Sequence, residues 1–220
     1  MVPTEVEDIG RGRRRLSRRR YVATFAHSNR LGALAYAAAD ALGGGEAKRQ
    51  QVLGDGADWI KTQEDLHFLR ALKTLNWGHI ERVVHKAIRA ALPGNGKRAQ
   101  RRELHASIPE RLWHGDVEGA LAALVALRPV GESEPIAVLE GAIGYLQGQR
   151  PWLGNYAQRQ ADGFSVGSGL VERAVALVIN RRMKKKGMRW CRQNADAVVA
   201  LRTCRLSEAW EEHITAHPAA

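Results

Sequence analysis

One stretch of the chain, QVLGDGADWI at residues 51–60, decides the fold class. It begins with a short apolar run at 51–53 and passes into a Gly-Asp-Gly turn, which predicts a buried strand whose end opens into a turn. A short helix is expected to begin at Asp58. Residues 67–77 are ambiguous, and 71–77 are compatible with a second buried strand. Strand, helix and strand in this order are typical of an α/β fold.

The sequence before and after this stretch extends the pattern. Residues 21–26, YVATFA, are rich in aromatic and β-branched side chains and predict a strand beside residues 51–54. An Ala- and Leu-rich helix is expected over residues 29–42, with glycines 43–45 ending it. Residues 80–150 are expected to be mostly helical, because apolar residues recur there at helical spacing.

Two helices are expected after a loop at residues 163–169. Ser168 should cap the first of them, and Gly187 should end it. Asn194 should cap the second, which runs from 195 to about 211. The apolar face predicted for the first comprises Leu170, Val171, Ala174, Val175 and Val178. The inward residues predicted for the second are Val198, Val199, Leu201, Leu206 and Trp210.

Composition excludes several classes of protein. With 220 residues, of which 45% are hydrophobic, the chain can bury a core. No apolar run approaches the ~18 residues of a membrane-spanning helix, and no signal-peptide pattern opens the chain. Cys191 and Cys204 lack the spacing of a zinc site. These features predict a soluble cytoplasmic or nucleoid-associated protein with no membrane partner.

The charge of the chain points to a polyanionic partner. Lys and Arg total 34 against 23 Asp and Glu, a net charge of +11. Seven arginines lie in residues 11–20, and residues 173–195 contain eight basic residues and no acid. Such clustering suits DNA or RNA, although a linker and a solvated helix end remain open alternatives. The predicted DNA-binding residues are Arg181, Arg182, Lys184, Lys185, Lys186, Arg189 and Arg192.

Two carboxylates, Asp55 and Glu172, lie at positions in the predicted elements that are typical of ligand-binding groups. Asp55 follows the predicted strand at 51–54, at the strand end where α/β sheets place ligand-binding groups. Glu172 lies in the first turns of a predicted helix, whose N-terminus favours an ionised ligand. The alternatives are an ordinary Asp-Gly turn and an ordinary first-turn glutamate. His79 is by default a helix-entry or partly buried histidine.

Several segments in order resemble insertion-sequence transposases of the Kra and Lre types. They are YVAT at 21–24, VLGDGADWI at 52–60, LNWGH at 75–79, VGSGLVE at 166–172, RMK at 182–184, GMRW at 187–190 and the helix at 197–202. The resemblance covers most of residues 20–210 and is weakest over 93–145. No single motif is specific, but their combination and order are.

The resemblance implies a prokaryotic DDE-type transposase on a ribonuclease-H-like fold, with DNA as its substrate and no small-molecule substrate. Asp55 would be the second catalytic and metal-binding carboxylate and Glu172 the glutamate, 117 positions later. Two Mg²⁺ or Mn²⁺ ions would activate the attacking oxygen and stabilise the leaving oxygen during cleavage and strand transfer of DNA. The glutamate helix is expected to pack on the sheet with its carboxylate facing Asp55.

This chain departs from the family pattern at two positions. The first Asp-Gly of the triad has no counterpart, so the metal site is expected to be incomplete unless Asp8 or Asp58 replaces it. The aspartate of the family's Leu-Asp-Trp motif is Asn76 here, and Asn76 and His79 are candidate assisting residues. The chain alone is therefore expected to bind metal weakly, to self-associate and to be inactive in strand cleavage.

These observations predict an N-terminally truncated ribonuclease-H-like α/β fold with an α-helical insertion. Residues 1–20 would be a basic flexible arm, 21–79 the sheet, 80–150 the insertion, and 151–220 the glutamate helix and C-terminal helices. The function predicted is that of a transposase fragment acting on insertion-sequence ends and target DNA. An inactive DNA-binding remnant is the main alternative. An RNA-handling protein is the third, although no aromatic RNA-binding pattern is present.

Overall fold

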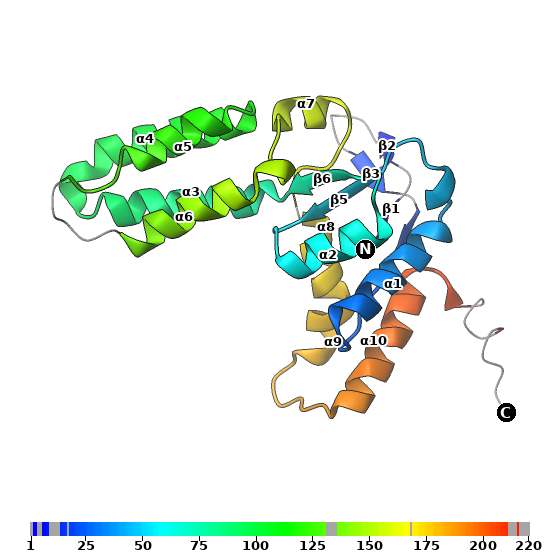
Figure 1. The fold of residues 1–220 in the computed structure, drawn as a ribbon. Helices are drawn as coiled ribbons and strands as arrows, with labels where there is room; N and C mark the ends of the chain where they lie inside the picture. The colour runs from blue at the N-terminus through cyan, green and yellow to red at the C-terminus, as the bar shows by residue number, and fades with distance from the viewer. Residues whose placement is uncertain are drawn as a thin grey trace. The chain divides into compact units, whose positions relative to one another are not determined.

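The computed structural model describes residues 2–3, 6–8, 14–16, 18–130, 136–167, 169–210 and 215 (Figure 1). The chain divides into two compact units. The first comprises Met1–Gln50, Asp58–Ala71 and Gly169–Ala220, and the second comprises Gln51–Ala57 and Leu72–Ser168. Each unit has its own helices and its own buried side chains, and each is described by itself.

The second unit begins from a small parallel sheet. Strands β5 (Gln51–Gly54) and β6 (Leu72–Leu75) pair in register, with Gln51 opposite Leu72 and Gly54 opposite Leu75. The strand predicted at 51–53 is therefore confirmed, and the ambiguous segment 71–77 forms a strand over Leu72–Leu75. The helix expected at Asp58 is also confirmed, as α2 (Asp58–His67), which connects the two strands along the chain.

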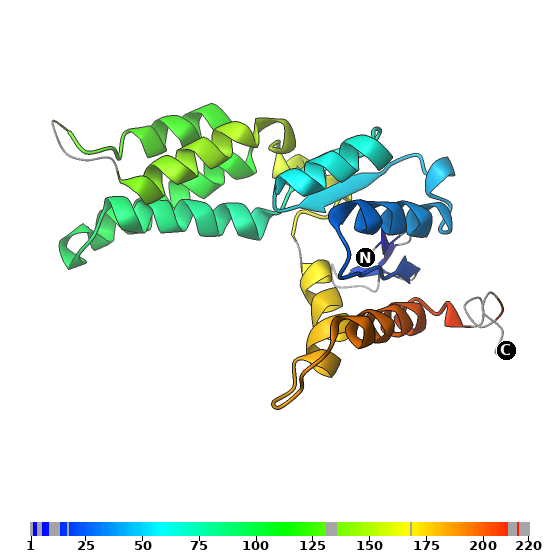
Figure 2. The ribbon, with the colours of Figure 1, turned by 60° about the horizontal axis from the view of Figure 1, so that its bottom comes forward.

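Four long helices follow β6 and lie side by side in both views (Figures 1 and 2). They are α3 (Trp77–Ala91), α4 (Arg98–Trp113), α5 (Val117–Val125) and α6 (Ala137–Gly148). Helix α3 forms because Asn76 caps it and Ile80, Val84, Ala87 and Ile88 recur on one buried face. The helical block predicted over residues 80–150 is thus present.

Aromatic residues fill the second unit where the helices meet the sheet. Tyr156, on α7 (Tyr156–Ala161), is fully buried and packs against Trp77, with ring centroids 5.0 Å apart. Its hydroxyl donates to the backbone oxygen of Leu75 at 3.0 Å, which satisfies the buried polar group. Trp113 on α4 contacts Trp77 edge-on at 4.8 Å. Strand β6 is therefore connected to the helical block by buried rings.

The first unit is built from helices that gather around a smaller core. It contains α1 (Ser28–Asp40), α2, α8 (Gly169–Val175), a π-helical turn (Ala176–Asn180), α9 (Arg181–Met183) and α10 (Arg192–Leu206). Figure 2 shows the α8–α9 arm and α10 as the two sides of a hairpin. Buried residues of this hairpin form one cluster with Tyr21, which precedes α1: Tyr21, Ala174, Val178, Met183, Ala195 and Val199.

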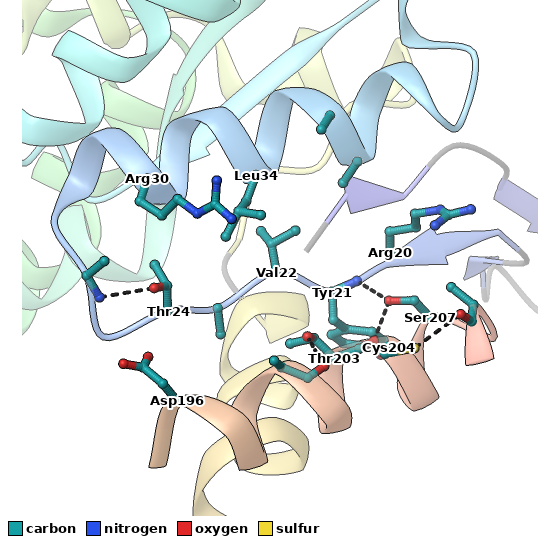
Figure 3. Close-up of a pocket in the computed structure, with 16 residues that line it drawn as sticks. Arg20, Tyr21, Val22, Thr24, Arg30, Leu34, Asp196, Thr203, Cys204 and Ser207 are labelled. Carbon is teal, nitrogen blue, oxygen red and sulfur yellow. Dashed lines mark hydrogen bonds between the residues drawn. The ribbon is translucent and has the colours of Figure 1, made fainter. Parts of the chain in front are cut away.

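The strand predicted at residues 21–26 is wrong. These residues are extended but pair with no strand in the described part of the chain. Side chains of the last helical segment take the hydrogen bonds a strand would need: Ser207 Oγ accepts from the Tyr21 amide at 2.8 Å, and Asp196 Oδ1 from the Phe25 amide at 3.0 Å. Figure 3 shows Tyr21 directed toward α10 and Val22 toward Leu34 on α1.

A groove of about 730 Å³ lies beside this extended segment, between α1 and α10 (Figure 3). Its lining is largely apolar, with Arg20, Arg30 and Asp196 as the charged members. None of the residues predicted for catalysis or DNA binding lines it. The groove is therefore separate from the predicted site.

The ribonuclease-H-like sheet is not evident in the described residues. Apart from β5 and β6, they contain two antiparallel pairs: β1 (Val2–Pro3) with β4 (Arg19–Arg20), and β2 (Val6–Asp8) with β3 (Arg14–Leu16). These short strands also occupy part of the segment expected to be a flexible arm. The structure supports a mostly helical chain with a small parallel sheet.

The C-terminal helices differ from their predicted boundaries and faces. Helix α10 begins three residues early, so Cys191 rather than Asn194 is its N-cap. Leu201 and Trp210 are exposed, as are Val171 and Val175 of the preceding helix, so only part of each predicted face is buried. The structure ends the preceding helix at Met183, before Gly187. The capping role predicted for Ser168 lies outside the described residues.

Candidate functional site

Asp55 lies at the carboxyl end of β5, as the sequence pattern predicts. Its side chain is exposed. The parallel register places Gly54 opposite Leu75, so the next residue of each strand, Asp55 and Asn76, lies at the same edge. The Asn76 amide donates to the Gly54 oxygen at 2.7 Å and extends the pairing by one bond. Two of the predicted site residues are therefore brought together within one unit.

The turn that carries Asp55 is held by hydrogen bonds from both sides. Asp55 Oδ1 accepts from the Ala57 amide at 3.2 Å, which closes a local turn. Tyr145 donates its hydroxyl to the Asp55 backbone oxygen at 2.9 Å, and Gln149 Nε2 donates to the Gly56 oxygen at 2.9 Å. Since Tyr145 and Gln149 are four residues apart, both reach the turn from neighbouring positions around α6.

Gly56 makes this close approach possible. Its φ of +82° belongs to the left-handed region, which glycine adopts at no steric cost. A Cβ atom added there would lie 2.7 Å from the Gln149 amide carbon. Gln149 is itself buried, so its side chain has little room to withdraw. Glycine at position 56 is therefore required by packing as well as by the turn.

His79 packs against Tyr145, the residue that donates a hydrogen bond to the Asp55 turn. It lies in the first turn of α3, half-buried, with its ring centroid 5.5 Å from that of Tyr145. Burial raises the pKa of the Tyr145 hydroxyl, and the negative charge of Asp55 raises it further. Tyr145 therefore stays protonated near neutral pH and acts as a hydrogen-bond donor to the turn. All three residues predicted here, Asp55, Asn76 and His79, are found around it.

Asn76 has a structural role in this geometry. Its side-chain Oδ1 accepts from the Gly78 amide at 3.2 Å, the bond expected of a helix N-cap. Aspartate makes the same bond, so this contact needs an oxygen acceptor but no charge. The difference from the family motif at this position therefore leaves the start of α3 intact.

Glu172 lies in the first unit, in the opening turn of α8, and its side chain is exposed. Asp55 belongs to the second unit, so each carboxylate is described within its own unit. Among the described residues no three His, Cys, Asp or Glu side chains form a group able to hold a metal ion. Asp58 is engaged in an ion pair with Lys61 at 3.2 Å, and nothing is described for the Asp8 side chain. The described ligands do not by themselves fit a two-ion site, and we derive no metal-dependent step.

The predicted DNA-binding cluster forms the end of the helical hairpin in the first unit. It runs from the last turn of α9, through the loop at 184–191, to the start of α10. All seven basic side chains are exposed, and in the described part of the chain none of them forms an ion pair. Their charge is thus available to a partner.

Internal contacts give this hairpin end a defined shape. Trp190 donates its indole N–H to the Met183 oxygen at 3.1 Å and so bridges the loop. The Arg182 guanidinium lies over the Trp190 ring, 5.8 Å from its centroid. Arg192 donates to the Phe25 oxygen at 2.8 Å. The GMRW motif therefore has a structural function: it closes the loop that presents the lysines.

Tyr145 and Gln149 were not predicted as site residues. Tyr145 lies on α6 and Gln149 is its C-cap, about ninety positions after the turn that they hold. Their only signal in the sequence is that two polar side chains stand four residues apart at the end of a largely apolar helix. The basic residues at 11–20 are a different case, because Arg11 and Arg13 lie outside the described residues and Arg14 and Arg15 are described only as part of β3.

Comparisons with protein-family models, with curated proteins and with solved structures find no match. Within the described ranges, no helix is both long and apolar enough to span a membrane.

Proposed function

We propose that this chain is a DNA-binding part of a DDE-type insertion-sequence transposase. The ordered resemblance over most of residues 20–210 supports the family, a ribonuclease-H-like core and the roles of Asp55 and Glu172. The single observation that carries the proposal is the hairpin end at 181–192. It presents seven exposed cations, and none of them is ion-paired in the described structure.

Binding of the phosphate backbone follows from this arrangement. Each cation that neutralises a phosphate releases counterions, so affinity rises with the number of contacts and falls with salt. Exposed lysines reach phosphates without reading base edges, which makes this part of the interaction independent of sequence. The hairpin therefore supplies affinity for DNA and leaves the recognition of insertion-sequence ends to other contacts.

Strand cleavage and strand transfer would need a third carboxylate beside Asp55 and Glu172, as the resemblance implies. The described residues contain no group of three ligands, which favours an inactive DNA-binding protein as the second candidate for this chain alone. Both candidates predict DNA binding and no cleavage by the chain alone. They differ in whether cleavage with Mg²⁺ or Mn²⁺ appears when a segment carrying a third carboxylate is added.

Fluorescence anisotropy with labelled duplex DNA tests the binding. Replacing Lys184, Lys185 and Lys186 with alanine should weaken binding equally on unrelated sequences and lower the salt slope by about 1 for each lost phosphate contact. The control replaces Arg111, Arg128 and Arg150 with glutamine. It removes the same charge from arginines that are already ion-paired. Unchanged affinity and slope in the lysine variant would contradict the proposal.

A cleavage assay, with and without a segment carrying a third carboxylate, separates the two candidates. The chain alone should not cut supercoiled or linear DNA in the presence of Mg²⁺ or Mn²⁺. Cleavage that is abolished by Glu172→Gln would show instead that a carboxylate of this chain, such as Asp8 or Asp58, completes the site.

A further inference from the structure

The exposed face of α3 carries a line of positive charge. Arg82, Lys86 and Arg89 follow one another at spacings of four and three, so they share one side of the helix. All three are exposed, while the buried residues of α3, from Ile80 to Ile88, occupy the opposite side. The line is therefore a continuous solvent-facing edge of the second unit.

Three further exposed cations lie where α4 begins. Lys97, Arg98 and Arg102 are exposed at the start of α4. Arg101 shapes the turn, because its guanidinium donates to the Leu92 and Gly94 oxygens at 2.6 and 2.5 Å. The α3–α4 stripe is the name used below for six cations: Arg82, Lys86, Arg89, Lys97, Arg98 and Arg102.

Charge in the second unit is segregated. Its arginine–carboxylate pairs join Arg111 to Asp116, Arg128 to Glu140 and Arg150 to Glu118, at 2.6 to 2.8 Å. No member of the stripe forms an ion pair among the described residues. The acids on the same segment, Glu81 and Glu103, are within ion-pair distance of none of the six. Arg111, Arg128 and Arg150 are therefore neutralised by neighbouring carboxylates, whereas the six cations of the stripe have no ion pair in the described part of the chain.

The stripe begins close to the Asp55 turn. Asn76, at the same sheet edge as Asp55, caps α3. At ~1.5 Å of rise per residue, Arg82 lies about 9 Å and Arg89 about 20 Å along the helix axis from Asn76. Duplex DNA carries a charge every ~1.7 Å of its axis, so the ~10 Å between Arg82 and Arg89 faces about six phosphate charges.

We propose that the α3–α4 stripe binds the backbone of duplex DNA as a second contact, leading away from the Asp55 turn along the helical insertion. This inference rests on the proposed function, because it takes DNA as the partner. An anionic membrane is the alternative polyanionic partner. Helices that bind a membrane surface place large apolar side chains beside their cations. Among the described residues 77–105 no large hydrophobic side chain is exposed, which favours nucleic acid.

The test compares salt-dependent DNA binding of full-length variants. Arg82, Lys86 and Arg89 are replaced together by glutamine, which keeps helix propensity on an exposed face. The salt slope should fall by ~2.7 for three lost phosphate contacts, and affinity at low salt should fall more than about tenfold. A second variant, with Lys97, Arg98 and Arg102 changed to glutamine, should act in the same direction. The Arg111, Arg128 and Arg150 triple variant again controls for net charge.

The outcomes separate this inference from the proposed function. If the wild-type chain does not bind DNA, both fail. If the lysine variant at 184–186 loses binding while both stripe variants keep wild-type affinity and slope, only the stripe is refuted. A stripe variant that loses binding to phosphatidylserine vesicles but not to DNA would also refute it, in favour of a membrane. Losses in both stripe variants, with the control unchanged, would support it.

Discussion

The Asp55 turn and the 181–192 hairpin end are the two places where function was predicted, and the structure holds them in different ways. Tyr145 and Gln149 donate to consecutive backbone oxygens of the turn, and a buried side chain lies against Gly56. The hairpin end is closed by the Trp190 bridge, while its lysines lie in solvent. Hydrogen bonds and packing therefore fix the backbone of the Asp55 turn, whereas the hairpin end exposes positively charged side chains to solvent.

This difference agrees with the chemistry proposed for each region. A carboxylate that acts at a reacting phosphate must be held to within a fraction of an ångström, so surrounding bonds should lock its backbone. Contacts to a phosphate backbone tolerate movement, because their energy comes from charge density and counterion release. Substitutions that disturb rigidity should therefore damage the turn far more than the hairpin.

The largest expected effect comes from a matched pair of glycine substitutions. Gly56 and Gly187 both have φ of +82°, but only Gly56 has a neighbour within 4 Å of an added Cβ. Gly187→Ala should cost about 1 kcal/mol of unfolding free energy, from the left-handed backbone alone. Gly56→Ala should cost roughly 2–4 kcal/mol, because it also displaces Gln149 and leaves a buried bond unmade. Urea denaturation measures both.

Equal losses of unfolding free energy in Gly56→Ala and Gly187→Ala would contradict the proposed rigidity of the Asp55 turn, since they would show that Gln149 moves aside freely. Combining Gly56→Ala with Gln149→Ala checks the cause. Shortening Gln149 removes the clash, so the two changes should cost less together than the sum of their separate effects.

A smaller effect is expected from Tyr145→Phe. This change keeps the ring beside His79 and removes only the hydrogen bond to the Asp55 oxygen, worth about 0.5–1.5 kcal/mol. Hydrogen exchange at the Gly56 and Ala57 amides should become faster. Tyr156→Phe is the control, because it removes a bond to Leu75 instead. Faster exchange at residues 56–57 in the control but not in Tyr145→Phe would refute the role of Tyr145.

The smallest effect expected is a pH dependence confined to the second unit. His85 and His105 lie with ring centroids 4.3 Å apart, with Arg89 and Arg101 nearby. Burial lowers the pKa of His105, and the positive charges of His85, Arg89 and Arg101 lower it further. The unfolded chain therefore binds more protons, and stability should fall as pH drops below the unfolded value of ~6.5.

Denaturation measured between pH 7.5 and 5.5 tests this expectation, and His105→Gln should reduce the slope. The 181–192 segment contains no histidine, so the protection factors of its amides, which correct for the intrinsic pH dependence of exchange, should not change over the same range. A wild-type stability that is flat across this range would refute the role of His105.

The elements predicted best are those whose signal is local. The Asp55 strand, its partner at 72–75, α1 and the helical block all follow from short apolar runs or helical spacing. Residues 21–26 carry an equally strong strand signal and yet remain unpaired. A strand needs a neighbour, and the Tyr21 and Phe25 amides are bound to side chains of residues 196 and 207, far along the chain. A local sequence pattern cannot indicate these contacts with residues far along the chain.

The residues of the candidate site also divide into those that local sequence predicts and those that depend on distant contacts. Asp55, Asn76 and His79 could be placed from the sequence, because parallel strands end at one edge and a helix follows the second strand. Tyr145 and Gln149 could not, since they reach the turn from a helix about ninety positions later. The stripe was missed because three cations in a helix of 15 residues are unremarkable until one face of α3 is known to be buried.

The sequence by itself determined the charge of this protein, the residues of its two basic segments, its helices and the strand end that carries Asp55. These properties depend on composition or on neighbours within a few residues. Only the tertiary structure decided that residues 21–26 pair with no described strand, that Gln149 requires a glycine at position 56, and that the six cations of the α3–α4 stripe form no ion pair with a described carboxylate. Each of these depends on groups that are distant in sequence, and packing alone brings such groups together.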